Sequence, residues 1–175
     1  QLMIYTKDVA MKRMHDEWTR GAPILLYMLK NGVIGADKTG LLAQLKKNAE
    51  DIYARGPNPT PEKMLSSQCY HLRTTADDFL DERPHDEELA IATTLYVDLL
   101  NFYTHQNHLW GSSGGKRAAR TLKEQAPEFA GKLVAAFDAY YKDGKKQDLL
   151  AMIDKMTTGV PCEMPNSRIV AAAVK

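Results

Sequence analysis

Cysteine is scarce in this sequence, neither sign of charge prevails and no apolar run is long; each absence excludes a class of protein. Two cysteines among 175 residues are too few for a disulfide framework or a cysteine-based zinc site. The 23 basic and 22 acidic residues leave a net charge of +1, which provides no general field to attract nucleic acid or an anionic membrane. No apolar run approaches the roughly 20 residues that cross a bilayer. We therefore expect neither a nucleic-acid partner nor a membrane partner.

The cysteines and the first residues bear on the cellular compartment. Cys69 lies on the apolar side of a predicted helix, far in the sequence from Cys162, and this position favours a small buried apolar residue. The first apolar stretch, residues 2–5, is far too short for a signal peptide. We therefore expect a cytoplasmic protein.

Helical periodicity dominates the sequence, and glycine and proline divide it into segments. The pattern predicts helices over residues 7–20, 23–32, 41–56, 60–80, 86–110, 116–125, 127–144 and 146–157. Residues 1–6, QLMIYT, are instead β-prone, and no other convincing strand follows with which they could pair. The expected fold is all-α, an antiparallel helical bundle preceded by one orphan β-strand. Residues 168–174, RIVAAAV, fit a strand or a short helix equally.

Two sets of polar residues on the predicted helices are candidates for a binding site. Asp98 and His105 lie seven positions apart and share a face of the long helix; they either line a site, with His105 as a base or ligand, or belong to a solvated face. Arg73 and Asp77 have the spacing of a helical ion pair, which is either a surface salt bridge or the mouth of a substrate cleft. His105 and His108 are three positions apart, but no third metal ligand is apparent, so no metal is expected here.

The most unusual stretch is HLWGSSGGKRAARTLKE, residues 108–124, in which five residues that are all Gly or Ser precede a cluster of basic residues. Backbone N–H groups at the start of a helix are unpaired donors, the helix dipole favours anions there, and glycines let a phosphate approach closely. The spacing is neither that of a P-loop nor GxGxxG. Gly114, Gly115, Lys116 and Arg120 are candidate phosphate ligands, and the alternative is a flexible connector.

The sequence contains no complete catalytic set. There is no recognisable nucleophile–base motif, neither GxSxG nor HExxH. There is also no pair of carboxylates on a strand after a Gly-Ser turn, which metal-dependent nucleotidyl transfer requires. The residues by themselves describe a helical binding domain.

Several segments, in their order along the chain, resemble the C-terminal part of a group of bacterial nucleotidyltransferases. They are LMIYT, GAPILLYMLKNGVIGADKTGLLAQL, RTTADDFLDE, LYVDLLNFYTHQNHLWGSSGGKRAARTLKEQAPEFAGKLVAAF and DLLAMIDKM. The most specific pieces are LLYMLKNG with the following Asp37 and Gly40, and the stretch from Trp110 through GKRAARTL. The group belongs to the DNA-polymerase-β-like superfamily, alongside the aminoglycoside nucleotidyltransferases, and the resemblance covers nearly the whole chain.

The resemblance implies two domains with different functions, one catalytic and one for binding the substrate. In this family an N-terminal α/β domain holds Mg²⁺ through carboxylates and transfers a nucleoside monophosphate from an NTP to a hydroxyl acceptor. Residues 1–6 would end the sheet of that domain, 7–56 would be connecting helices, 57–158 the substrate-binding bundle and 159–175 a C-terminal tail. Because the catalytic carboxylates would precede Gln1, we expect the chain alone to be inactive. We also expect a nucleotide and a small-molecule acceptor as ligands, and a homodimer.

The resemblance also places the candidate residues around a substrate cleft. The loop from Gly114 to Arg120 and the polar faces with Arg73, Asp77, Asp98 and His105 would look toward it. The alternatives are a stand-alone helical interaction module and the partner of a separate minimal nucleotidyltransferase, as in toxin–antitoxin pairs. A toxin-like helical RNase needs Arg and His four to six positions apart on a helix, and no such pair surrounds Arg73 or His105.

Overall fold

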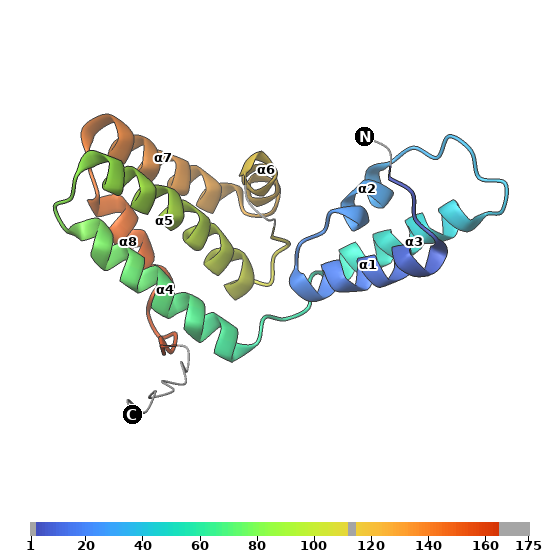
Figure 1. Cartoon of the computed structure of the whole chain (residues 1–175), viewed down its shortest axis with the longest axis horizontal. Helices are drawn as coiled ribbons and strands as arrows, with labels where there is room; N and C mark the ends of the chain where they lie inside the picture. The colour runs from blue at the N-terminus through green and yellow to red at the C-terminus, as the bar shows by residue number, and fades with distance from the viewer. Residues whose placement is uncertain (1–2, 112–114, 165–175) are drawn as a thin grey trace, which may run out of the picture.

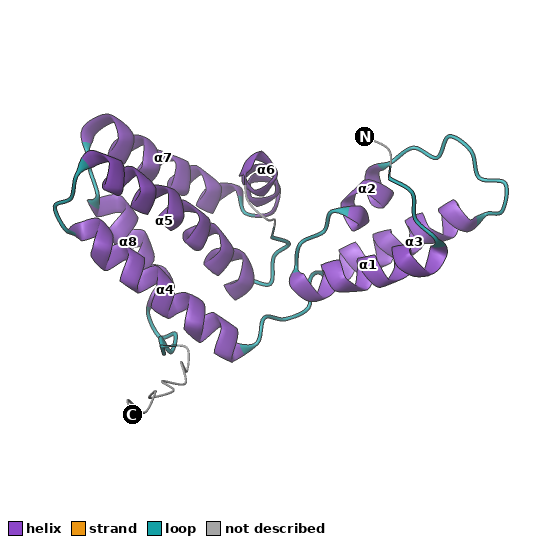
Figure 2. Cartoon of the chain, in the orientation of Figure 1, coloured by secondary structure: helices purple, strands orange, loops and turns teal. Residues whose placement is uncertain are grey.

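The computed structural model describes residues 3–111 and 115–164, and within them the chain forms helices and no strand. Figures 1 and 2 show their arrangement as two groups of helices. The helices are α1 (Lys7–Arg20), α2 (Leu25–Asn31), α3 (Leu41–Arg55), α4 (Glu62–Leu80), α5 (His85–Gln106), α6 (Gly115–Gln125), α7 (Pro127–Asp143) and α8 (Gln147–Thr157). The prediction of a helical bundle is confirmed. Gly114 and residues 168–174 lie outside the described residues.

Local signals explain where several helices begin and end. The Thr6 hydroxyl accepts a hydrogen bond from the backbone N–H of Val9, which caps the start of α1. Gly21 ends α1 and Gly144 ends α7, each in the left-handed conformation that glycine adopts without strain. Pro127 occupies the first position of α7, where its missing N–H costs nothing. These caps make the observed bounds agree closely with those predicted from the sequence.

Two expectations about individual segments differ from the structure. Residues 3–6, expected within an orphan strand, are not in a strand, because no described segment pairs with them and Thr6 already serves as the cap of α1. The long helix, expected to reach residue 110, ends at Gln106. Two positions later His108 adopts φ 54°, and this turn redirects the chain so that Trp110 packs among α1–α3.

The helices enclose two hydrophobic cores. The larger core lies among α4, α5, α7 and α8, with contributions from α6. Its fully buried large side chains are Leu72, Phe79, Leu95, Leu99, Phe102, Leu122, Leu133 and Leu149. The smaller core lies among α1, α2 and α3, and Trp110 enters it from beyond α5. We call these groups the bundle unit (α4–α8) and the N-terminal unit (α1–α3).

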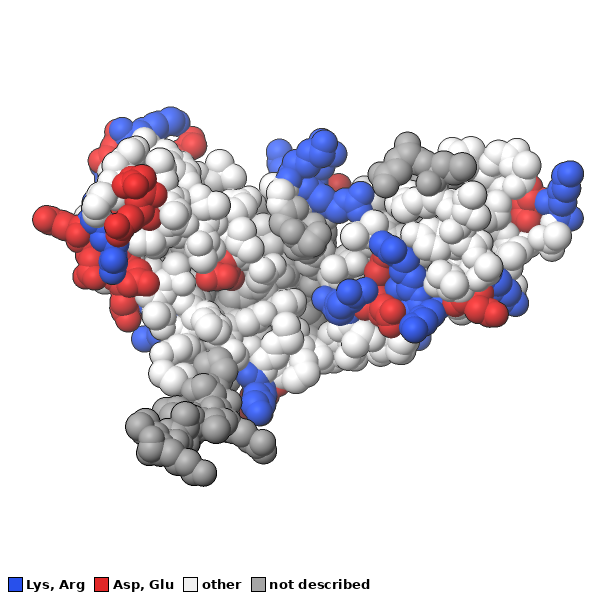
Figure 3. Space-filling model, in the orientation of Figure 1, with Lys and Arg blue, Asp and Glu red and all other residues white. Residues whose placement is uncertain are grey.

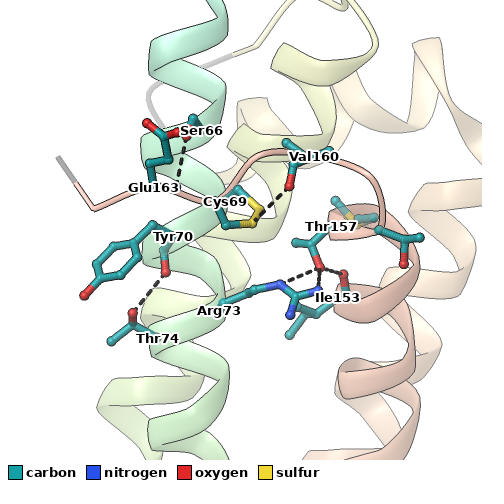
Figure 4. Close-up of a disulfide and its surroundings, with 12 residues drawn as sticks. Ser66, Cys69, Tyr70, Arg73, Thr74, Ile153, Thr157, Val160 and Glu163 are labelled. Carbon is teal, nitrogen blue, oxygen red and sulfur yellow. Dashed lines mark hydrogen bonds between the residues drawn. A yellow bond between two sulfur atoms is a disulfide. The ribbon is translucent and has the colours of Figure 1, made fainter.

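Cys69 is a small buried residue of the larger apolar core, as expected, but it also forms a disulfide that was not expected. Cys69 is bonded to Cys162, and their Cα atoms lie 5.0 Å apart although 93 positions separate them in the sequence. Residues 158–164 return from the end of α8 to α4, where the backbone N–H of Glu163 donates to Ser66 Oγ at 3.0 Å (Figure 4). The sequence did not predict the disulfide, because this pairing depends on a long-range return of the chain, which no local pattern encodes.

Glu17 is the one buried charged residue of the N-terminal unit among the described positions, with 2% of its surface exposed. Its carboxylate accepts hydrogen bonds from the backbone N–H groups of Leu25 at 2.8 Å and Leu26 at 3.0 Å. It also pairs with Arg13 Nε at 3.2 Å. Since α2 has no capping side chain at its own N-cap, Glu17 of α1 caps α2 from a neighbouring helix.

Replacing Glu17 with alanine should lower the free energy of unfolding by about 2–3 kcal/mol, because a buried donor without a partner costs about 1–3 kcal/mol. Urea titration followed by circular dichroism measures the change. Glu17→Gln should lose less, since its amide oxygen still accepts one hydrogen bond. Glu50→Ala on the exposed face of α3 is the control, and an equal loss in both alanine variants would contradict the capping role.

Candidate functional site

Charged side chains are unevenly spread over the face of the molecule in Figure 3, and two concentrations stand out. Figure 3 shows Asp and Glu concentrated at the end of the bundle unit where α4 meets α5, and Lys and Arg gathered over α6. Since the net charge of the chain is only +1, attraction of an anion depends on such a local cluster. The basic cluster on α6 faces the N-terminal unit, and a cavity lies between them.

This cavity, which we call the basic cavity, has a volume of about 150 Å³. Lys116, Arg117 and Arg120 of α6 line one wall. The start of α2 and the residues before it line the other, through Ala22, Pro23, Ile24 and Tyr27. Three cationic side chains beside one small cavity favour an anion with more than one negative charge.

The remaining lining limits what the basic cavity can hold. Thr121 contributes a hydroxyl, and Glu124 contributes the one carboxylate among the described lining residues. The guanidinium of Arg117 lies 5.9 Å from the ring centre of Tyr27, a cation–π distance. The volume accepts a phosphate group but is below the roughly 300–1,000 Å³ of sites that enclose a drug-sized ligand.

The wall of the basic cavity is anchored by contacts between the two units. Gly111 donates its backbone N–H to the carbonyl of Gly21 at 2.7 Å. Trp110 Nε1 donates to the carbonyl of Tyr53 at 3.0 Å, and the two rings stack with centres 5.1 Å apart. The side chain of Gln125, the last residue of α6, binds both the N–H and the carbonyl of Trp110. These contacts hold α6 in place opposite α2.

The structure separates the sequence-predicted residues rather than gathering them. Lys116 and Arg120 line the basic cavity, whereas Gly115 is the first residue of α6. Arg73 does not pair with Asp77; its Nε and Nη2 donate to Thr157 Oγ1 at 3.1 and 2.8 Å (Figure 4). Arg73 therefore joins α4 to α8, and Asp77 remains an exposed carboxylate on α4.

Asp98 and His105 lie on the same helix but have different environments. Asp98 accepts a hydrogen bond from Thr75 Oγ1 at 3.4 Å, and burial raises the pKa of its carboxyl group. His105 Nδ1 contacts the side-chain amide of Gln68, with a shortest distance of 2.8 Å. Burial lowers the pKa of His105, which favours the neutral imidazole. Neither residue lines the basic cavity.

Sequence reasoning missed the α2 side of the basic cavity. Pro23 and Tyr27 lie about 90 positions before the basic residues, and no spacing in either segment points to the other. Asp37, which belongs to one of the segments that carry the family resemblance, makes a contact within the N-terminal unit. Its carboxylate accepts a hydrogen bond from the backbone N–H of Ala43 at 2.9 Å. This hydrogen bond to the first turn of α3 lowers the pKa of Asp37.

The described residues offer no metal centre and no membrane span. Among them no three His, Cys, Asp or Glu side chains lie close enough together to hold a metal ion. None of their helices is both long and apolar enough to cross a bilayer.

Comparisons of the chain with protein-family models, with curated proteins and with solved structures find no match.

Proposed function

We propose that this chain is the helical substrate-binding part of a nucleotidyltransferase and that the basic cavity binds a phosphate group. The observation that supports the proposal is the convergence of Lys116, Arg117 and Arg120 on one cavity facing α2. Arginine and lysine side chains are the usual protein donors to phosphate oxygens. The phosphate belongs to the NTP or to a phosphorylated acceptor.

The chemical step is assigned to a separate catalytic domain or subunit. That part would supply the carboxylates that hold Mg²⁺, and the nucleoside monophosphate would pass from the NTP to the acceptor hydroxyl with release of pyrophosphate. The described helices hold the substrate against it. We expect no nucleotide transfer by this chain alone, and transfer only when a catalytic partner is present.

The phosphate proposal is tested by replacing Lys116 and Arg120 together with alanine. Calorimetric titration with inorganic pyrophosphate should show an affinity at least about 100-fold lower in the variant, because two charged partners are removed and hydrogen bonds to charged groups contribute about 1.5–3 kcal/mol each. The charge-matched control is Lys63→Ala with Lys123→Ala. Both lysines are exposed, and neither lines the basic cavity. Equal affinities in the two double variants, or no binding by the unmodified chain, would remove the phosphate site.

A second candidate function is a stand-alone interaction module, and one observation favours it. Eight of the 15 large apolar side chains that are exposed in the described residues lie within residues 3–42. They are Met3, Ile4, Val9, Met11, Met28, Val33, Ile34 and Leu42. Where such side chains form one contiguous patch, the patch is typical of a surface that another protein covers. Sedimentation over a range of concentrations distinguishes a second copy of the chain, which doubles the mass, from a different partner.

A further inference from the structure

A second cavity between the two units is distinct from the basic cavity. It has a volume of about 230 Å³ and lies where the end of α1, residues 57–61 and the end of α5 meet. Its polar lining comprises Thr19, Arg20, Asn58, Thr60, Thr104, His105 and His108, and its apolar lining includes Pro57, Pro61, Met64 and Leu109. We call it the histidine cavity.

The charge of the histidine cavity differs from that of the basic cavity. Arg20 is its single permanently charged lining residue, and no carboxylate lines it among the described residues. The Nε of Arg20 donates to the carbonyl of Asp16 at 3.1 Å, which leaves the two terminal nitrogens of the guanidinium for a ligand. One positive charge and a lining without a carboxylate favour a monoanion, whereas three cations favour a phosphate.

His105 also lines the histidine cavity and can contribute a second donor. Its Nδ1 contacts the side-chain amide of Gln68 on α4, and no described residue makes a hydrogen bond to its Nε2. Because the Gln68 amide can present either N–H or oxygen to Nδ1, the imidazole can carry its proton on Nε2 and donate to an anion. The contact with Gln68 therefore fixes the ring while leaving one nitrogen for a ligand.

We propose that the histidine cavity binds the carboxylate of a small organic acid. Arg20 and His105 Nε2 hold the carboxylate, and the apolar body of the acid packs against Pro57, Met64 and Leu109. A volume below the roughly 300–1,000 Å³ of drug-sized sites restricts the ligand to a small molecule. The proposal involves a different cavity and different residues from the phosphate site, so it does not rest on the proposed function.

The test uses isobutyrate as the probe and isobutyramide as its neutral isostere, each titrated into the whole chain at constant pH and ionic strength. Imidazole ¹H–¹⁵N spectra report the histidines, and the signal of His105 is assigned from His105→Gln. Isobutyrate should shift the signals of His105 and His108 saturably, whereas His15, His71 and His85 should remain unchanged. Isobutyramide should bind at least tenfold more weakly, since it lacks the charge.

A matched pair of arginine variants tests the role of charge. Arg20→Gln should weaken isobutyrate binding at least tenfold. Arg55→Gln should leave isobutyrate binding unchanged, because Arg55 does not line this cavity. It is a matched control, since Arg55 also ends a helix and its Nε also donates to the carbonyl four residues earlier. Equal effects of the two variants, equal binding of the amide, or the absence of a saturable shift would overturn the proposal.

Two further measurements separate this site from the phosphate site. The variant with Lys116 and Arg120 replaced by alanine should bind isobutyrate with the affinity of the unmodified chain. Inorganic phosphate should displace isobutyrate only at concentrations at least tenfold above those of isobutyrate itself. Loss of isobutyrate binding in that variant, or displacement by phosphate at equal concentration, would overturn the assignment of a separate monoanion site.

Discussion

Replacing Trp110 with alanine is expected to lower the free energy of unfolding by about 3–5 kcal/mol, the usual range for a buried aromatic residue. Only 3% of the surface of Trp110 is exposed, and the side chain lies in the core of the N-terminal unit although it follows α5 of the bundle unit. The substitution removes the stacking on Tyr53 and the hydrogen bond from Nε1 to the Tyr53 carbonyl. It should therefore also loosen the junction between the two units.

Urea unfolding followed by circular dichroism measures the loss of stability. Trp110→Phe is the informative companion, because it keeps an aromatic ring against Tyr53 but cannot make the hydrogen bond, and it should lose about 1–2 kcal/mol. A single unfolding transition in the unmodified chain and two in Trp110→Ala would indicate that the units have become uncoupled. A Trp110→Ala variant as stable as the unmodified chain would contradict the packing described above.

Breaking the disulfide is expected to lower the free energy of unfolding by about 2–5 kcal/mol. The bond closes a long loop, with 93 positions between Cys69 and Cys162, and a cross-link over a long loop removes much of the entropy of the unfolded chain. Reduction leaves residues 158–164 held to the bundle unit by the packing of Val160 and Cys162 against the core and by the hydrogen bond from Glu163 to Ser66. Urea unfolding with and without dithiothreitol measures the difference.

The control for reduction is the variant with both cysteines replaced by alanine. Dithiothreitol should not change its stability, and its stability should match that of the reduced unmodified chain. A thiol count in the denatured protein should find no free thiol before reduction and two after it. Unchanged stability on reduction of the unmodified chain, despite two released thiols, would show that the bond does not stabilise the fold.

The thiol count also bears on the compartment. Thiols in the cytosol are kept reduced, whereas disulfides persist in oxidising compartments. The disulfide is thus at odds with the cytoplasm expected from the sequence, and the compartment stays a prediction. Protein isolated in the presence of a thiol-blocking reagent distinguishes the two cases: two blocked thiols favour the cytoplasm, and none favours an oxidising environment.

Much of the candidate site could not be read from the sequence. The basic residues Lys116 and Arg120 were found because charge and glycine stand together in one short segment. Their partners Pro23 and Tyr27 come from a distant segment that reaches them only through the packing of α2 opposite α6. The spacing of Arg73 and Asp77 is that of an ion pair, but the Arg73 guanidinium instead donates two hydrogen bonds to Thr157 Oγ1 on α8.

The sequence by itself determined the helices, because their signals are local. Apolar periodicity, the Thr6 cap, Pro127 and the stops at Gly21 and Gly144 act within a few residues, and the structure keeps those bounds. Only the tertiary structure decided what the helices bring together. Three features join segments whose local sequence patterns do not predict that they meet. They are the capping of α2 by Glu17, the Cys69–Cys162 bond and the two cavities between the units. The physical reason is that such contacts are selected by burial and by the need to pair buried polar groups once the whole chain has collapsed.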